Sequence, residues 1–255
     1  MNRDFAELCV TTNFSFLRGA SHPEELVFQA KSLGLTGIGV ADRNTLAGVV
    51  RAHAAAKEAG LRLAIGARLV FRDRTPDVLV YPQDRAAYAR LTRLLTIGNR
   101  RAPKGECWLD LNDLLEHAEG QLAIVAPTLG AGAAADDNLH ACLGAIRESS
   151  GQVWLASRFT FDGEDRRRLR LLKDLAEHAG ARLLATTEPL HHKPERRALL
   201  DVLTCIREKT TLDAAGRLLA ANAERHLKTP AEMARLYSGA PALIEESLRL
   251  LEAVR

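Results

Sequence analysis

The sequence has no apolar run of about 18 residues, the length that a membrane-spanning helix requires. Its first four residues carry charge and lack the apolar core of a secretion signal. Cysteine is scarce, and no two cysteines are separated by only two residues, which excludes a zinc knuckle and a dithiol redox motif. We therefore expect a cytoplasmic chain without membrane contacts, whose thiols are reduced. These are Cys9, Cys107, Cys142 and Cys205.

Several common catalytic signatures are also missing. The sequence contains no Gly-x-Ser-x-Gly elbow, no Walker phosphate loop and no complete Rossmann fingerprint. Gly130-Ala131-Gly132 follows a predicted strand but lacks the third glycine and the acidic partner. The net charge is only +3, so binding to DNA does not follow from charge alone.

What the sequence does contain is a regular alternation of short apolar segments and amphipathic helical segments. Short apolar runs separated by helices are typical of parallel β-α-β units. We predict strands over residues 5–10, 36–41, 61–65, 69–71, 78–81, 122–126, 153–156 and 183–186. After the first helix, further helices are predicted over 45–59, 84–97, 112–117, 136–148, 164–178 and 195–208.

The first helix has clear boundary signals. Ser21 and Glu24 have the spacing of a capping box, and Pro23 fits the first turn, where its missing N–H costs little. Gly34 is a natural end for this helix.

The alternation predicts the fold class α/β, as a distorted, closed or nearly closed β/α barrel. Active sites of such barrels lie at the carboxyl ends of the strands. After residue 212 the pattern is helical only, with Pro230 and Pro241 starting two helices. We therefore expect a barrel domain over 1–212 and a helical extension over 213–255. The chain stops at Arg255 within a helical pattern, which favours a fragment of a longer protein.

Three sequence blocks resemble one known family. Residues 13–26 read NFSFLRGASHPEEL, residues 42–53 read DRNTLAGVVRAH, and Pro194-Glu195-Arg196-Arg197 precedes DVLTCIRE at 201–208. These blocks are similar, in register over nearly the whole chain, to the N-terminal PHP domain of bacterial C-family DNA polymerases, the polymerase III α-subunit type. Within this family, the sequence of these blocks resembles that of the error-prone, damage-tolerant branch most. The resemblance implies a distorted β/α barrel that packs beside the palm and thumb of a polymerase, with the 213–255 helices leading towards the palm.

The resemblance also implies a metal site. Active PHP domains hold divalent ions with His and carboxylate side chains, which activate water for phosphoester cleavage or for a proofreading exonuclease. The residues at the matching positions here are Cys9, Thr11, Arg18, Arg43, Arg68, Phe159, Glu188 and Leu190. Three of them are arginines, which stay protonated. A guanidinium about 4 Å from a single positive charge costs roughly 4 kcal/mol at an effective dielectric of 20, and more beside a divalent ion.

We therefore expect no metal, no cofactor and no catalytic residue in this chain. Arg43 and Arg68 are expected to form buried ion pairs with Asp42 and Glu188 in place of metal. His191 and His192 are expected in a surface loop before a helix.

The predicted function is that of a non-catalytic structural domain of an error-prone DNA-directed DNA polymerase. This parent enzyme would use magnesium for synthesis across DNA damage, in replication and repair. Its partners would be the palm and thumb, DNA through the parent enzyme, translesion accessory proteins and a sliding clamp. The alternative is a residual metal-dependent phosphoesterase or 3′–5′ exonuclease. It would bind zinc or manganese through Cys9, Asp42, Glu188 and His192.

Overall fold

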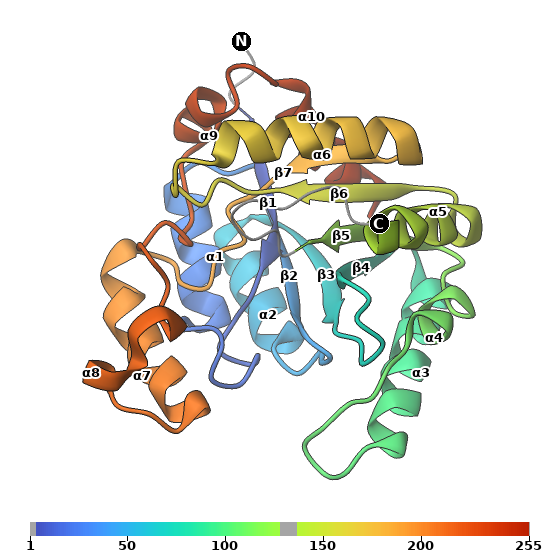
Figure 1. Cartoon of the computed structure of the whole chain (residues 1–255), viewed down its shortest axis with the longest axis horizontal. Coiled ribbons are helices and arrows are strands. Elements are labelled where there is room, and N and C mark those ends of the chain that lie inside the picture. The colour runs from blue at the N-terminus through green and yellow to red at the C-terminus, as the bar shows by residue number, and fades with distance from the viewer. Residues whose placement is uncertain (1–3, 128–136, 255) are drawn as a thin grey trace.

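The computed structural model describes residues 4–127 and 137–254 (Figure 1). In this part of the chain, seven strands form one curled sheet in which neighbours in sequence are neighbours in space. The strands are β1 (Ala6–Val10), β2 (Gly37–Arg43), β3 (Arg62–Leu69), β4 (Asp77–Pro82), β5 (Gln121–Ala126), β6 (Val153–Ser157) and β7 (Arg182–Ala185). The α/β class and the barrel-like curvature that the sequence predicts are confirmed.

Helices surround the sheet (Figure 1), and none that the structure describes is both long and apolar enough to cross a bilayer. In chain order they are α1 (Pro23–Ser32), α2 (Val49–Ala59), α3 (Arg85–Arg101), α4 (Leu111–Leu115), α5 (Asp137–Ser150), α6 (Asp165–Ala179), η1 (Pro194–Arg196), α7 (Arg197–Glu208), α8 (Leu212–Ala215), η2 (Gly216–Leu218), α9 (Pro230–Leu236) and α10 (Ala242–Ala253).

Two predictions about the sheet are wrong. The two strands predicted over 61–65 and 69–71 are replaced by a single strand, β3, which ends at Leu69, because Gly66 interrupts the apolar pattern without turning the chain. A Cβ on Gly66 would lie 2.4 Å from the carbonyl oxygen of Val80, so the absence of a side chain lets β4 approach closely. The sheet is also not wholly parallel, since β4 runs antiparallel to both β3 and β5.

The predicted capping box of α1 is wrong by one residue. His22 is the N-cap, and the Glu25 side chain accepts a hydrogen bond from its backbone N–H at 2.9 Å. The Ser21 hydroxyl is 2.7 Å from Nδ1 of His192, so it ties the start of the helix to the segment after β7. Tertiary contact therefore takes the side chain that a purely local pattern assigns to the cap.

Two apolar layers hold the sheet. Outward-facing strand residues pack against the surrounding helices, while the inner face is filled by small and large side chains from the strands and by Leu250 and Leu251 of α10. α10 packs closely against the start of β2, since a Cβ on Gly37 would lie 2.5 Å from the side chain of Leu251. α10 thus closes the amino-terminal end of the barrel, and the carboxyl ends of the strands are left for a site.

β1 and β7 are the edges of the sheet, and no strand ladder joins them in the described structure. Side chains bridge this seam instead. The buried Glu7 carboxyl accepts hydrogen bonds from the Thr186 hydroxyl at 2.5 Å and from the Thr187 N–H at 2.8 Å. Beyond the strands, the Thr11 N–H donates to the carbonyl of Pro189 at 3.1 Å. In the described structure the barrel therefore lacks a strand ladder at this seam and is closed there by these hydrogen bonds.

Candidate functional site

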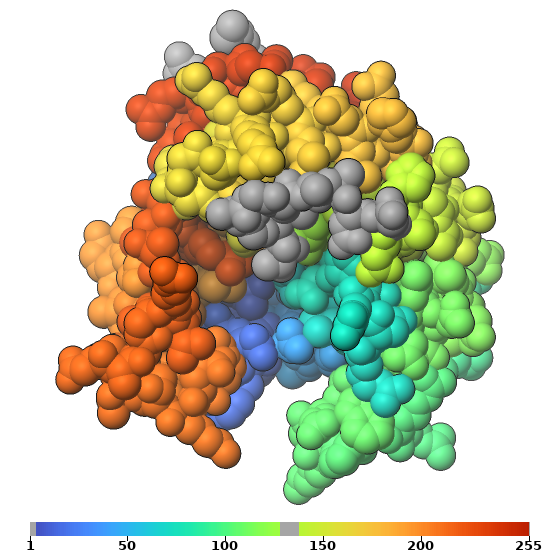
Figure 2. All heavy atoms as spheres, in the orientation of Figure 1, coloured from blue at the N-terminus to red at the C-terminus, as the bar shows by residue number. Residues whose placement is uncertain are grey.

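A cavity of about 360 Å³ lies where the carboxyl ends of the parallel strands meet. β4 is antiparallel, so its first residue, Asp77, reaches the same end. Figure 2 shows the surface hollowed between the α7–α8 segment and the distal end of α3. Arginines dominate the wall, with six of them against three carboxylates; these are Arg18, Arg43, Arg68, Arg158, Arg207 and Arg225, and Asp77, Glu188 and Asp201.

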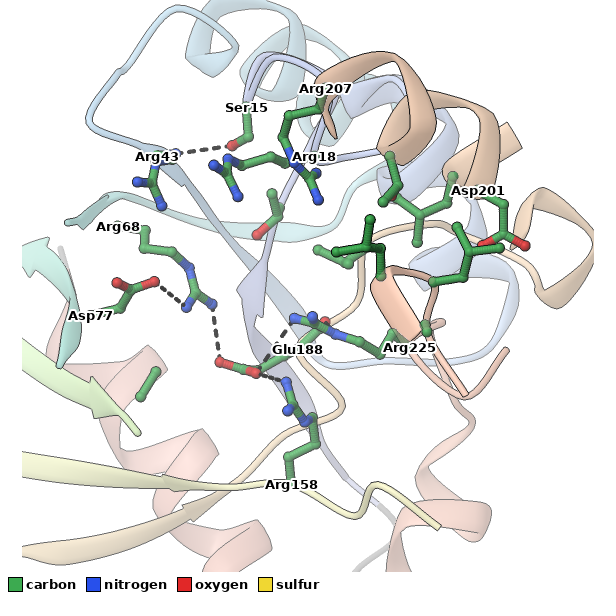
Figure 3. Close-up of a pocket in the computed structure, with 18 residues that line it drawn as sticks. Ser15, Arg18, Arg43, Arg68, Asp77, Arg158, Glu188, Asp201, Arg207 and Arg225 are labelled. Carbon is green, nitrogen blue, oxygen red and sulfur yellow. Dashed lines mark hydrogen bonds and ion pairs between the residues drawn. The ribbon is translucent and has the colours of Figure 1, made fainter. Parts of the chain in front are cut away.

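Glu188 is the centre of the lower part of this cavity (Figure 3). Its backbone φ is 45°, in the left-handed region that side chains other than glycine seldom adopt. Arg68 donates to Oε1 at 3.1 Å, Arg225 donates to Oε2 at 3.4 Å, and Arg158 also pairs with Oε2. Three guanidinium groups therefore hold one carboxylate that is only 9% exposed.

The charge state of Glu188 follows from these contacts. Burial by itself would raise its pKa, but Arg158, Arg68 and Arg225 outweigh burial and lower the pKa to about 2. Arg68 also pairs with Asp77 at 3.3 Å, which gives this guanidinium two acidic partners. The expected pairing of Arg68 with Glu188 is confirmed.

The upper part of the cavity has a different electrostatic character. Arg18, Arg43 and Arg207 lie together there (Figure 3). In the described structure, neither Arg18 nor Arg43 has a carboxylate within 4.0 Å of its guanidinium. Burial, and after it the charges of Arg43 and Arg207, lower the pKa of Arg18. Arg207 pairs with Glu208 at 2.8 Å, so the three guanidinium groups of this part have one carboxylate partner within 4.0 Å in the described structure.

The expected ion pair between Asp42 and Arg43 is wrong. Asp42 is buried and accepts hydrogen bonds from the N–H and hydroxyl of Thr12, at 2.8 and 2.7 Å, and from the Ser15 hydroxyl at 2.6 Å. Burial raises the pKa of this carboxyl. Hydroxyl donors in the irregular segment after β1 satisfy the carboxyl, so the Arg43 guanidinium remains in the cavity.

The other positions that match family ligands separate into two groups. Thr11 and Leu190 line the cavity. Cys9 is fully buried in the inner core of the barrel, where burial raises the pKa of its thiol. Phe159 packs edge-on against Tyr237, with ring centroids 4.9 Å apart. Cys9 and Phe159 therefore have packing contacts rather than a place in the cavity wall.

The adjacent histidines are not both in a surface loop. His191 is 1% exposed and its ring stacks on His226, and burial lowers its pKa to about 4. His192 is partly buried against Ser21 and does not line the cavity. The prediction of a surface loop is wrong for His191, because the segment after β7 folds back over the Arg225–His226 segment.

Sequence reasoning missed five charged residues of the site, which are Asp77, Arg158, Asp201, Arg207 and Arg225. Arg158 immediately follows β6, so the rule that sites form at strand ends could have found it. Asp77 begins β4, which runs antiparallel to β3, so a rule about the carboxyl ends of parallel strands does not point to it. Arg207 and Arg225 come from a helix and from an irregular segment, and no local signal directs them towards the strand ends.

A family model described as the PHP domain matches residues 7–150, more than half of the chain. The chain belongs to the PHP domain family.

Relatives of this PHP domain are much longer proteins. It is 49% identical over 250 residues to an error-prone DNA polymerase of Caulobacter vibrioides, covering 98% of this chain and 23% of the relative. It is 53% identical over 260 residues to an error-prone DNA polymerase of Bradyrhizobium diazoefficiens, covering 98% of this chain and 22% of the relative. The PHP domain thus spans less than a quarter of the length of these curated relatives.

Solved structures support the fold of this PHP domain. One is a putative metal-dependent phosphoesterase from Bifidobacterium adolescentis, with a TM-score of 0.51 and 16% identity over 72% of this chain and 86% of that one. Another is an amidohydrolase from Chromobacterium violaceum, with bound sulfate and no metal, with a TM-score of 0.53 and 14% identity over 73% and 87%. At these identities the likeness concerns the fold alone.

In the described structure, the carboxylates of Asp42 and Glu188 already have partners from the protein itself. Among the residues that the structure describes, no three His, Cys, Asp or Glu side chains are grouped so that they could hold an ion. Asp42 accepts three hydrogen bonds from hydroxyl and amide donors, and Glu188 is held by three guanidinium groups. A cation here would have to displace these donors and approach charges of its own sign.

Proposed function

We propose that this chain is a non-catalytic, structural PHP domain of an error-prone, damage-tolerant DNA polymerase, and that its metal site is degenerate. The observation that carries the proposal is the contact of Glu188 with Arg68, Arg158 and Arg225. A hydrolytic metal centre needs carboxylates or imidazoles with free lone pairs, and an open position for water. Here the carboxylate at the matching position already has its charge neutralised by the protein itself.

The contacts between these arginines and Glu188 also explain how the domain would keep its shape without metal. In the described structure, Arg68 connects β3 to Asp77 at the start of β4 and to Glu188 after β7. Arg158 connects β6 to the same carboxylate. These contacts tie together strand ends that metal ions bridge in active members of the family, so guanidinium charge replaces metal charge as the structural link.

The polymerase part of the proposal rests on the relatives, which are error-prone DNA polymerases at 48–53% identity. We propose that the parent protein is a cytoplasmic DNA-directed DNA polymerase. It would use magnesium in a separate catalytic domain for translesion synthesis during replication and repair. DNA, translesion accessory proteins and a sliding clamp would bind to other parts of this parent enzyme.

A structural role requires a surface for the rest of the polymerase, and α7 offers one. Leu199, Val202 and Ile206 are 39%, 40% and 57% exposed, and their spacing puts them on one side of the helix. We call these three residues the α7 apolar face. Leu212 and Leu218 of the following segment are also more than half exposed. A run of exposed apolar side chains is typical of a contact surface, and we propose that it packs against the palm or thumb.

The proposal is tested by metal content and hydrolysis measured on one sample. The purified chain is analysed for zinc, manganese and other divalent metals, before and after incubation with each metal and removal of the excess. The same samples are assayed for phosphodiesterase activity on a generic substrate and for exonuclease activity on single-stranded DNA. We expect well under one metal ion per chain and no turnover.

The opposite result would support the alternative, a residual metal-dependent phosphoesterase or exonuclease. It requires stoichiometric zinc or manganese and turnover that disappears in the Cys9→Ala and Glu188→Gln variants. Turnover that survives in both variants would indicate a contaminating nuclease instead.

A further inference from the structure

The proposed structural role leaves part of the cavity unexplained. The lower arginines neutralise Glu188, but Arg18 and Arg43 neutralise no carboxylate within 4.0 Å in the described structure. Arg207 pairs only with its sequence neighbour Glu208, at 2.8 Å, and donates to the carbonyl of Leu17. Three guanidinium groups therefore converge in one cavity although their mutual repulsion opposes folding.

The net formal charge of the cavity wall is +3, since six arginines face three carboxylates. One of those carboxylates, Asp201, also pairs at 2.7 Å with Arg197, which lies outside the wall. Burial lowers the pKa of Arg43 although the charge of Asp77 opposes it, and the charges of Arg68 and Arg207 act in the same direction as burial. An anion that enters the cavity relieves this repulsion and replaces the water that the guanidinium groups have lost.

We propose that this cavity is a metal-independent binding site for a phosphate-type oxyanion, held by Arg18, Arg43 and Arg207. Guanidinium groups suit this ligand because each presents a planar fork of N–H donors that matches two phosphate oxygens. Thr11 and Thr204 line the same cavity, and a threonine hydroxyl can donate to a further oxygen. A volume of about 360 Å³ exceeds what one phosphate fills, so a pyrophosphate group also fits.

The phosphate has two possible sources, and the surface next to the cavity makes both testable. A second hollow of about 800 Å³ shares Arg18 and Arg43 with the cavity. Phe14, Phe16 and Trp108 line this hollow, and Phe16 is 81% exposed. Aromatic rings beside arginines are suited to stacking nucleobases. The phosphate can therefore belong to a free ion or to a nucleotide chain.

The experiment is isothermal titration of the purified chain with pyrophosphate and with orthophosphate, at low ionic strength. A chelator is present throughout, so that phosphate cannot be held through a bound metal. The test variants are Arg43→Gln and Arg18→Gln. The matched control is Arg93→Gln, which removes one positive charge from an exposed position on α3 outside both hollows.

We expect saturable binding of pyrophosphate by the wild-type chain, at least tenfold weaker in Arg43→Gln and Arg18→Gln and unchanged within twofold in Arg93→Gln. Without ligand, the two test variants should melt at the same temperature as the wild type or higher, because they remove repulsion. Loss of binding together with a lower melting temperature would indicate misfolding, and this comparison separates the two causes.

A short 5′-phosphorylated single-stranded oligonucleotide distinguishes the sources. If it binds more tightly than pyrophosphate, is displaced by pyrophosphate and is weakened by Arg43→Gln, the site takes the phosphate of a nucleic acid. If only the free ions bind, the ligand is a free phosphate. The proposal is overturned if no probe binds, or if Arg93→Gln weakens binding as much as Arg43→Gln. Metal uptake by the chain would contradict the structural role proposed above without deciding this one, since the chelator removes metal from the titration.

Discussion

Glu188 shows how one buried charge depends on its neighbours. A carboxylate taken out of water is costly unless it is paired, and removal of one member of a buried pair is more damaging than replacement of the whole set. The pKa of Glu188 is lowered from 4.5 to about 2, although burial works in the opposite direction. Because the folded-state pKa is the lower one, this carboxylate stabilises the fold above pH 4.5, and the contribution is lost as the pH falls towards 2.

The Glu188→Gln variant should therefore be less stable than the wild type at neutral pH, by about 3 kcal/mol. The difference should shrink as the pH falls from 4.5 to 2, because the protonated wild-type side chain is also neutral. Urea unfolding followed by circular dichroism at pH 7 and pH 2.5 measures both values. Glu119→Gln, at a side chain that is 80% exposed, is the control and should change stability by less than about 0.5 kcal/mol.

A second variant identifies the physical cause. If unpaired positive charge destabilises Glu188→Gln, the additional change Arg158→Gln should recover part of the lost stability at pH 7. A double variant that is no more stable than Glu188→Gln would contradict this explanation of the contact.

The sequence predicted the partner of a charged side chain correctly where both residues lie at strand ends. It predicted the partner wrongly where a loop supplies the hydrogen-bond donors. Arg68 was correctly paired with Glu188, because both positions lie at strand ends. Asp42 was wrongly paired with Arg43, because hydroxyls of Thr12 and Ser15 reach it first. Hydroxyl donors in an irregular segment leave no periodic pattern, so sequence alone could not place them.

Among the helices, α7 combines two roles on opposite sides. One side contributes Leu200, Thr204 and Arg207 to the cavity wall, and the other carries the α7 apolar face. Exposed apolar side chains add nothing to the stability of the isolated domain, but they gain free energy when another surface covers them.

The variant Ile206→Glu should leave the melting temperature of the isolated chain unchanged. In the full-length parent polymerase it should lower the melting temperature of the domain and reduce primer extension. The reason is that a carboxylate would be placed in an apolar contact. Val50→Glu on α2, a position that is 78% exposed, is the matched control. Equal effects of both variants on the full-length enzyme would argue against a specific role for α7.

The end of α2 was predicted correctly at Ala59, and the end of α6 was predicted to within one residue. α2 and α6 end at Gly60 and Gly180, whose φ values of 59° and 63° are in the left-handed region that glycine adopts without strain. The start of α2 was placed four residues too early, at Thr45 instead of Val49. Residues 45–48 have helical character in sequence, but they form part of the loop after β2, whose course is set by tertiary contacts.

The barrel as a unit depends on the return of the chain to its beginning. α10 contacts both sheet edges: the Ser247 hydroxyl accepts from the N–H of Ala6 in β1 at 3.3 Å, and Glu246 pairs with Arg182 of β7 at 3.7 Å. Glu246 also accepts from the indole of Trp154 in β6 at 3.0 Å. Sequence periodicity identified a helix near Pro241 but gave no indication of where it packs, because packing across 241 residues is a non-local property. The division at residue 212 stays a prediction; the structure shows that α10 shares the inner core.

Leu250 is fully buried in that core, so Leu250→Ala should lower the free energy of unfolding by about 2–5 kcal/mol. The loss should appear as one unfolding transition at a lower temperature or denaturant concentration, since α10 and the strands are expected to unfold together. In a Trp108→Phe background, fluorescence reports on Trp154 beside α10 and circular dichroism reports on the helices. Leu218→Ala, at a 54% exposed position, is the control. Two separate transitions would mean that the extension unfolds independently of the barrel.

The arginines around Glu188 bear on whether the domain depends on a supply of metal ions. A metal centre must be loaded after synthesis, competes with other proteins for its ion, and is lost to a chelator. The guanidinium groups of Arg68, Arg158 and Arg225 are made on the ribosome together with the fold they support. They stay charged across the physiological pH range. On the function proposed above, metal starvation, which would empty an active PHP centre, is expected to leave this domain folded.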